Sequence, residues 1–497
     1  MIVDIPALVD YPNHLARIHV IAEIGEDPEL AANYDVVWAA MPNLAMDLVV
    51  PPLAGVLPLE IAGRVFIALT MLMLIAATAA LHRVLHGRIG LWPVAVCLLL
   101  YNHLLIMGFL NYLFALGVAL ALFAAWIVRA RWPAWLHWTV FPVSLIGLFF
   151  AHLFGLVVYG ICVAAYEAPG LGQAWRGERR VAVRQAVVTA WQFLPAAMLV
   201  LLTMPEGVER DFLYGPLLAK VRALWSPTLT YLKPIDVAVF LFAAAVPLVG
   251  AMTGRLTLVR SLRLPLIVLA SAAVVMPFWI QGAWGSIWYA DLRLPIVLSL
   301  LLIAGLHPRN IDARLAVAIL GAGAVLLGGR VADIAFEWRR MDADFAEFRT
   351  AAQRIERGAA ILPVQRRNVP VPAGETRFDF AYWHVPTLAV IDRAAFVPTL
   401  FTDPAKQAVR AAPARDRMDT AFGAPIDVAL LVESARGTGD DDSASAHVAI
   451  RNFWADWPRR FDYVLLTHFG ARGNPLPQQL TAIHEGSYFT IYRIVGE

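Results

Sequence analysis

Residues 59–81 read LEIAGRVFIALTMLMLIAATAAL. This run is long enough to cross a bilayer, because a spanning helix needs about 20 mostly apolar residues. Further apolar runs follow at 90–107, 110–128, 138–151, 152–167, 184–204, 235–252, 264–281, 294–306 and 312–328. The stretch 138–167 can be read as one long helix or as two short ones. The pattern predicts an α-helical polytopic membrane protein with about ten transmembrane helices.

Composition supports the same class. Hydrophobic residues make up 59% of the chain and charged residues 16%, whereas soluble domains carry about 25% charged residues. The net charge of +2 gives no reason to expect a nucleic-acid partner. The two cysteines, Cys97 and Cys162, both lie inside apolar runs. Neither a disulfide framework nor a cysteine metal motif is therefore expected.

Arginine predicts the orientation, because short cytoplasmic connections collect Lys and Arg. Alternate connections are rich in arginine: Arg83, Arg88, Arg129, Arg131, Arg176, Arg179, Arg180, Arg255, Arg260, Arg263, Arg309 and Arg314. The intervening ones hold fewer basic residues: Arg210, Lys220, Arg222, Lys233 and Arg293. We therefore expect an extracytoplasmic first segment (1–58), a transmembrane domain (59–330) and an extracytoplasmic domain (331–497) in a bacterial cytoplasmic (inner) membrane.

The last segment has a different pattern. From residue 331 to 358 the apolar positions alternate in steps of three and four, which predicts an amphipathic helix: Ile334, Trp338, Met341, Phe345, Phe348, Ala352 and Ile355. Short apolar runs follow, and the alternating stretch 488–495 predicts a strand. Residues 434–445 are rich in Gly, Asp and Ser and predict a loop. We expect a small α/β domain.

The scarce polar residues near the spans are the main functional signal. The segment Asp10-Tyr11-Pro12-Asn13-His14-Leu15-Ala16-Arg17 places three ionisable residues ahead of the first span. In the orientation above, further polar residues lie at the same outer face: Asp4, His103, Asn111, Tyr112, His152, Asp291 and Arg293. Ionisable groups in a membrane are costly, and they mark functional sites by default.

Each of these residues also has a structural interpretation. Asn111 could cap its helix, Asp291 and Arg293 could form an ion pair, and His103 and His152 could bridge helices. Asp-Tyr-Pro-Asn could be a plain turn. The chain contains no P-loop, no HExxH motif and no Gly-x-Ser-x-Gly elbow. The glycines 321, 323, 328 and 329 lie inside an apolar run, which indicates helix packing.

With its many spans, acidic first outer segment and outer C-terminal domain, the chain resembles the GT-C superfamily of membrane glycosyltransferases, and most of all its bacterial GT-C-like members. The resemblance rests on Asp10–Arg17, on Gly108-Phe109-Leu110-Asn111-Tyr112 and on Ala290-Asp291-Leu292-Arg293. It covers the membrane half by architecture and the C-terminal part only loosely.

The resemblance implies an outer-face transferase that moves a sugar from a polyprenyl-phosphate donor, within the membrane lipid, to an acceptor. In that superfamily an acidic residue of the first outer loop acts as catalytic base or metal ligand. Asp10 would be this residue, with His14 beside it, and Arg17 and Arg293 would bind the donor phosphate. A carboxylate can deprotonate a hydroxyl, and the guanidinium fork fits a phosphate. The other outer-face polar residues would support the site.

The chain also departs from that superfamily. Its members usually carry a helix before the first loop, and such a helix is absent ahead of Asp10. An outer segment of 58 residues requires either translocation by the first span or an upstream helix, lost here through a misplaced start, and the sequence leaves both open. Their first loop commonly pairs two acids, whereas Asp10 is followed by Tyr11 and the nearby second acid is Asp4. The sequence names no metal ligand and leaves a divalent cation open as cofactor.

Two other functions compete with this hypothesis. A transporter or flippase of a lipid-linked or small polar substrate would favour ionisable residues in mid-membrane and broken helices. The polar residues gather instead at the span ends. A non-catalytic assembly protein would use the outer domain as its binding module.

Overall fold

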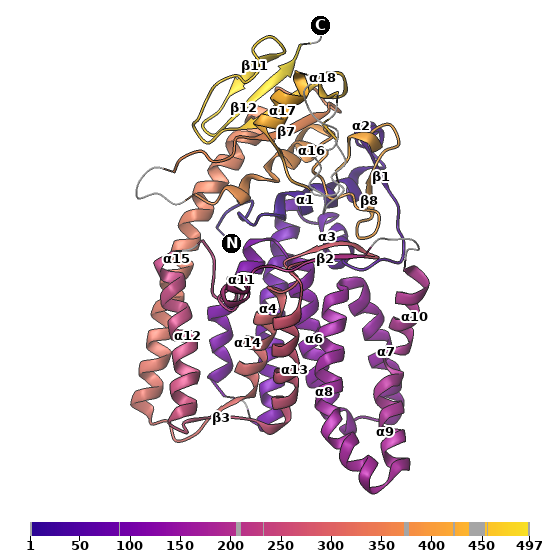
Figure 1. The fold of residues 1–497 in the computed structure, drawn as a ribbon, viewed down its shortest axis with the longest axis vertical. Helices are drawn as coiled ribbons and strands as arrows, with labels where there is room; N and C mark the ends of the chain where they lie inside the picture. Colours follow the sequence, from indigo (N-terminus) through magenta and orange to yellow (C-terminus); the bar gives the residue numbers. More distant parts are fainter. Residues whose placement is uncertain are drawn as a thin grey trace. The chain divides into compact units, whose positions relative to one another are not determined.

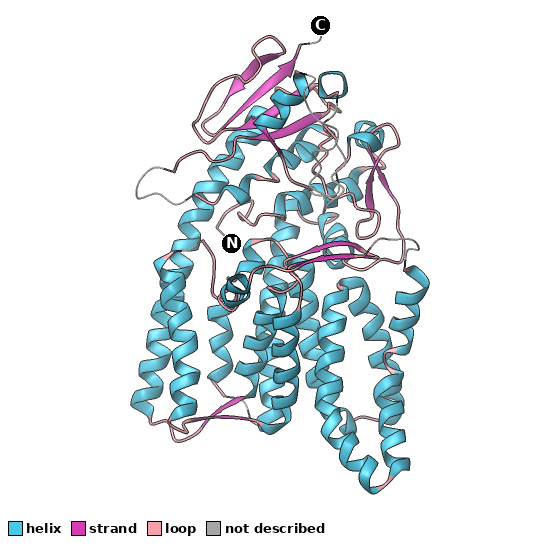
Figure 2. Ribbon diagram, viewed as in Figure 1, coloured by secondary structure: helices cyan, strands magenta, loops and turns pink. Residues whose placement is uncertain are grey.

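The computed structural model describes residues 2–88, 90–204, 210–231, 233–371, 377–420, 423–436, 453–454 and 456–495. Helices predominate over strands (Figure 2). The chain forms two compact units. The terminal unit comprises residues 1–39, 47–65 and 334–497, and the helical unit comprises 40–46 and 66–333. The sequence alone had separated residues 1–58 from 331–497, whereas most of the first segment and nearly all of the second belong to one unit.

Long helices build the helical unit (Figure 1). Its helices are α4 (Leu59–His86, from Phe66 on), η1 (Trp92–Leu99), α5 (His103–Ile106), α6 (Leu110–Val128), η2 (Arg129–Arg131), α7 (Ala134–Ala151), α8 (Leu153–Gly177), α9 (Arg179–Trp191), α10 (Leu194–Thr203), α11 (Leu217–Ala223), α12 (Pro234–Met252), η3 (Arg260–Leu262), α13 (Arg263–Val275), α14 (Arg293–Gly305) and the first half of α15 (Ala313–Ala352). Two small antiparallel sheets join β2 (Asp211–Leu213), β4 (Trp279–Gly282) and β5 (Gly285–Trp288), and β3 (Leu256–Leu258) with β6 (Leu306–Pro308).

The expectation of about ten transmembrane helices is confirmed only in part. Among the described residues, five helices are long and apolar enough to cross a membrane, namely α4, α6, α8, α12 and α15. The count becomes six if α9 and α10, which are bent by 49° against each other, form one span. The remaining apolar helices are shorter. The protein therefore has the helices of a membrane protein.

Local chemistry explains where the predicted runs break. The run 90–107 is split because Asn102 caps α5, its Oδ1 accepting from Leu105 N at 3.1 Å. The run 264–281 ends as a helix at Val275, and Met276 is extended ahead of Pro277, as a residue before proline tends to be. The stretch 138–167 forms two helices because His152 is extended, with φ −173° and ψ 124°.

Small residues allow close helix packing at positions other than the predicted glycines. A Cβ at Gly155 of α8 would lie 2.8 Å from Ala115 Cβ of α6, and one at Gly117 would lie 2.6 Å from Met73 Cγ. A Cβ at Gly321 or Gly328 would meet no atom within 4 Å in the described part of the chain, which does not support the packing role inferred for these two, whereas one at Gly329 would lie 3.5 Å from Ile235 Cδ1. Gly323 contributes modestly, since its Cβ would lie 3.6 Å from Phe242, where α12 and α15 run side by side (Figure 1).

The terminal unit combines the two ends of the chain. Its helices are α1 (Tyr11–Glu23), α2 (Pro28–Asn33), most of α3 (Ala45–Ala54), the start of α4, the second half of α15, η4 (Asp379–Tyr382), η5 (Val385–Thr387), α16 (Leu388–Arg393), η6 (Asp416–Met418), α17 (Val428–Ala435) and α18 (Trp457–Arg460). Strand β1 (Tyr34–Val36) pairs antiparallel with β8 (Val409–Ala411). Residues 437–445 of the predicted loop lie outside the described part, and α17 extends to Ala435.

A five-stranded mixed sheet has the order β11-β12-β10-β7-β9. Its strands are β7 (Ile361–Gln365), β9 (Ile426–Asp427), β10 (Tyr463–Thr467), β11 (Leu480–Glu485) and β12 (Phe489–Ile494). Strand β7 runs parallel to both β9 and β10, and β12 runs antiparallel to both of its neighbours, β10 and β11. The small C-terminal sheet that the sequence predicts is therefore present.

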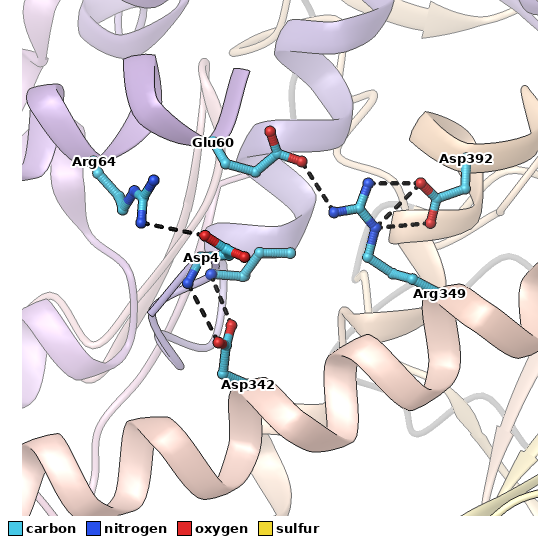
Figure 3. A network of polar contacts seen from close by, with 7 residues as sticks. Asp4, Glu60, Arg64, Asp342, Arg349 and Asp392 are labelled. Atoms are coloured by element: carbon cyan, nitrogen blue, oxygen red, sulfur yellow. Dashed lines mark hydrogen bonds and ion pairs between the residues drawn. The ribbon is translucent and has the colours of Figure 1, made fainter. Parts of the chain in front are cut away.

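The predicted amphipathic helix is the second half of α15 and ends at Ala352. Every residue of its apolar stripe is buried, from Ile334 at 2% exposed to Ile355 at 1%. Polar contacts on α15 anchor other segments of the terminal unit (Figure 3). Arg349 binds Asp392 through Nη2 at 2.7 Å and Glu60 through Nη1 at 3.0 Å, and Asp342 accepts from the backbone N of Ile5 at 2.9 Å.

Candidate functional site

Asp10 occupies the N-cap position of α1 but does not cap it. No side-chain capping hydrogen bond forms, and Pro12 lacks the N–H that a cap often satisfies. Its carboxylate instead lies 3.5 Å from His384 Nε2. The Asp10 side chain is 17% exposed, and that of His384 is 3% exposed. The carboxylate is thus fixed on one side and open to solvent on the other.

Asn13 determines the tautomer of His384. Its Oδ1 accepts from Phe401 N at 2.8 Å, and its Nδ2 donates to Thr399 O at 2.7 Å. The same Nδ2 lies 3.0 Å from His384 Nδ1, which must therefore act as an acceptor. Because a neutral imidazole has one N–H, the proton resides on Nε2 and points towards Asp10. The contact is thus a 3.5 Å approach of a neutral imidazole to a carboxylate.

Aromatic packing holds these groups in place. The Phe401 ring lies edge-on to His384 at 5.0 Å and to His14 at 5.8 Å. Gly423, in the left-handed region at φ 65°, packs against both: a Cβ there would lie 2.7 Å from Phe401 and 3.0 Å from His384. His14, predicted as a second catalytic residue, is 6% exposed and belongs to this wall.

Arg17 lies inside the terminal unit. Its Nε and Nη2 each bind a different oxygen of Asp47 at 2.7 Å, and both side chains are fully buried. A guanidinium bound in this way presents no surface to a phosphate group, so the geometry favours a structural role. Asp4 is 81% exposed and lies 3.5 Å from Arg64 Nη1. No group of three or more His, Cys, Asp or Glu suited to a metal ion occurs among the described residues.

Arg293 forms the centre of a second polar site, in the helical unit. Its Nη1 lies 3.1 Å from His152 Nε2, and its Nη2 donates to Trp288 O at 3.3 Å. The guanidinium carbon lies 4.9 Å from the ring centre of Phe109 and 5.3 Å from that of Tyr112. The Tyr112 hydroxyl donates to Arg293 O at 2.7 Å. Arginine stacks on aromatic faces while keeping its charge, so this site suits an anion.

Asp291 pairs with Lys220 and not with Arg293. Lys220 Nζ lies 2.8 Å from Asp291 Oδ2, and both side chains are largely buried. The suggested Asp291–Arg293 ion pair is therefore absent between these two described residues, because Lys220 neutralises the carboxylate. His103 lies nearby, with its ring edge-on to Tyr289 at 6.2 Å.

Asn111 does not cap its helix. Its Oδ1 accepts from Met46 N at 2.8 Å and its Nδ2 donates to Asn43 O at 2.6 Å. The capping interpretation is wrong, because α6 begins at Leu110 after Phe109 and Asn111 lies inside the helix. Asn111 therefore connects the segment 40–46, which includes the start of α3, to α6.

The helical unit also contains an apolar cavity of about 330 Å³ between η1, α12, α14 and α15. None of the polar residues predicted for the site lines it; its lining includes Phe240, Ser299 and Leu327. A fully buried pair lies elsewhere in this unit, with Arg330 Nη2 3.9 Å from Asp236 Oδ1. Sequence reasoning did not identify either member.

His384 is the residue that sequence reasoning missed in the terminal unit. It follows the aromatic stretch Phe380-Ala381-Tyr382-Trp383. The sequence signal that could have identified His384 is a polar, ionisable residue between this aromatic stretch and Pro386. Asp47 was missed as well, although it is an isolated acid in an otherwise apolar stretch.

Comparison with known proteins finds no matching family model, no matching curated protein and no matching solved structure.

Proposed function

We propose that the protein is a membrane glycosyltransferase that moves a sugar from a polyprenyl-phosphate donor to an acceptor on the outer face of a bacterial cytoplasmic membrane. The supporting observation is the environment of the Asp10 carboxylate. It does not cap α1, it lies 3.5 Å from Nε2 of the neutral His384, and its side chain is 17% exposed.

The proposed chemistry follows from this arrangement. Asp10 accepts the proton of the acceptor hydroxyl while the oxygen bonds to the anomeric carbon of the sugar. The bond between that carbon and the phosphate oxygen breaks, and polyprenyl phosphate leaves with the electron pair. His384 N–H steadies the carboxylate during the proton transfer. For the helical unit taken by itself, we propose that Arg293 binds a phosphate group, because a guanidinium fits an oxyanion.

Asp10→Asn tests the proposal, since the amide keeps the size of the side chain and cannot act as a base. The purified full chain in lipid nanodiscs would receive synthetic polyprenyl-phosphate hexoses and pentoses with an envelope extract as acceptor source. Released polyprenyl phosphate is measured by mass spectrometry. We expect turnover to fall by about 10²–10⁴-fold, the usual contribution of general acid–base catalysis.

Asp4→Asn is the matched control, because Asp4 is an exposed acid of the same segment that does not contact His384 in the described structure. It should keep full turnover. Unfolding midpoints of both variants show whether they fold. Normal turnover in Asp10→Asn, or no consumption of any donor by the wild-type protein, would contradict the proposal.

A further inference from the structure

The sheet of the terminal unit contains a topological switch point, where the connections after two neighbouring parallel strands lead to opposite sides of the sheet. Along the chain the parallel strands come in the order β7, β9, β10, but in the sheet β7 lies between the other two. After β7 the chain leads to β9 on one side, and after β10 it leads to β11 and β12 on the other. In open α/β sheets, ligands bind outside the carboxyl ends of strands at such a switch point.

Arginines follow both strands at this point. Gln365 ends β7 opposite Thr467, which ends β10. Arg366 comes next after β7, and its backbone N donates to Thr467 O at 2.8 Å. Arg472 lies in the loop after β10. The carboxyl ends of the two strands therefore bring two guanidinium groups to the same edge.

The charges of these two arginines are not neutralised within the described part of the chain. Arg366 Nη2 donates to Gly473 O and Arg472 Nη2 donates to Gly486 O, each at 3.4 Å. Arg366 Nε is buried without a hydrogen-bond acceptor among the described residues. Their neighbours differ: Arg367 lies 3.7 Å from Asp427, and Arg377 binds Asp379.

His468 follows β10 directly, and the charges of Arg366 and Arg472 act on its pKa. Its Nδ1 accepts from Gly470 N at 3.1 Å, so its proton is on Nε2, which lies 3.2 Å from Thr490 Oγ1. Burial lowers the pKa of this imidazole most. A backbone hydrogen bond at Phe489 and the charge of Glu485 raise it, whereas the charges of Arg472 and Arg366 lower it. The two arginines are therefore the cationic groups of this edge, and the histidine adds no charge to it.

The loop after β10 also has a strained aromatic residue. Phe469 has φ 48°, a left-handed conformation that is uncommon for a bulky residue. Such backbone strain clusters at binding sites. The Phe469 ring lies under the Arg377 guanidinium at 4.3 Å and edge-on to Tyr382 at 5.2 Å.

From these observations we propose that the β7–β10 edge binds an oxyanion, a phosphate or carboxylate group, through Arg366 and Arg472. The two guanidinium groups would donate to its oxygens. This site does not depend on the proposed glycosyl transfer, since it uses none of the residues assigned to that reaction.

The test is an anion titration of the purified full chain in zwitterionic detergent at constant ionic strength. Inorganic phosphate, and in a second series glucuronate, is raised to about 20 mM while the unfolding midpoint is recorded, because a ligand of the folded state raises it. Arg366→Gln and Arg472→Gln should each weaken binding about tenfold or more. Arg367→Gln is the matched control, an exposed arginine that already has Asp427 as partner, and it should bind as the wild type does.

Nanodiscs distinguish the sources of a phosphate group. If the ligand is a lipid headgroup, phosphatidylglycerol discs should raise the midpoint relative to phosphatidylcholine discs and abolish the response to inorganic phosphate. If it is a soluble anion, the two lipids should give the same response. The absence of any response from the wild-type protein, or an equal loss in Arg367→Gln, overturns the proposal.

Discussion

Asp10 and Arg17 lie about two turns apart along α1, yet they have opposite environments. The guanidinium of Arg17 is fully buried and paired with Asp47, whereas the side chain of Asp10 is partly exposed to solvent. Charges are removed from water only at a cost of several kcal/mol each, which a good partner offsets. A residue in the first situation serves stability, and one in the second can react.

Asp47→Ala should therefore destabilise the protein strongly. It leaves the Arg17 guanidinium buried without its carboxylate, which costs about 3–5 kcal/mol. The measurement is the free energy of unfolding in detergent. The double variant Arg17→Met, Asp47→Leu should recover much of the loss, and Asp4→Ala, which removes an exposed carboxylate, should change little. A small effect of Asp47→Ala would show that the pair contributes nothing.

His468 should make stability depend on pH. Burial lowers its pKa in the folded state below the usual value of about 6.5. Between the two values the unfolded chain binds more protons, so stability rises with pH through this window. It is lost as pH falls from about 6.5 towards the folded pKa and levels off below it.

His468→Asn should flatten this dependence, since the Asn side chain can still accept from Gly470 N but does not titrate. Unfolding midpoints measured between about pH 7.5 and 5.5 provide the comparison. An equal slope in wild type and variant would assign the pH dependence to other groups.

At the scale of elements, sequence reasoning predicted a helix correctly where the hydrophobic pattern within that segment alone determines it. The run 110–128 was predicted with the bounds that α6 has, and the apolar stripe of α15 is buried throughout, because hydrophobic periodicity is local information. It failed where breaks depend on a cap or a proline, as at Asn102 and Pro277. It could not find His384, whose partner Asn13 is 371 positions away.

Helix approach inside the terminal unit predicts a selective effect of glycine substitution. A Cβ at Gly63 of α4 would collide with Tyr11 Oη and lie 2.8 Å from Leu15 Cδ2, both on α1. Gly63→Ala should therefore cost about 1–3 kcal/mol, as overpacking does. Gly147→Ala, in α7 with nothing within 4 Å, should be neutral or stabilising. Unfolding in detergent measures both, and equal effects would rule out the packing explanation.

At the scale of the whole molecule, the arginine pattern makes a prediction about sidedness. The proposed function requires the terminal unit to face the outside, and the positive-inside rule places the connection after α8 in the cytoplasm. The chain suits cysteine mapping, because its two cysteines are Cys97 and Cys162, of which Cys162 is buried. Replacing both by serine gives a background without thiols.

Single cysteines at two exposed positions then test the orientation. Thr481→Cys, on β11, should react with a membrane-impermeant maleimide in intact cells whose outer membrane has been permeabilised. Gln173→Cys, near the end of α8, should react only after the inner membrane is disrupted. If Thr481→Cys reacts only after the inner membrane is disrupted, the terminal unit faces the cytoplasm, and an acceptor on the outer face could not reach Asp10.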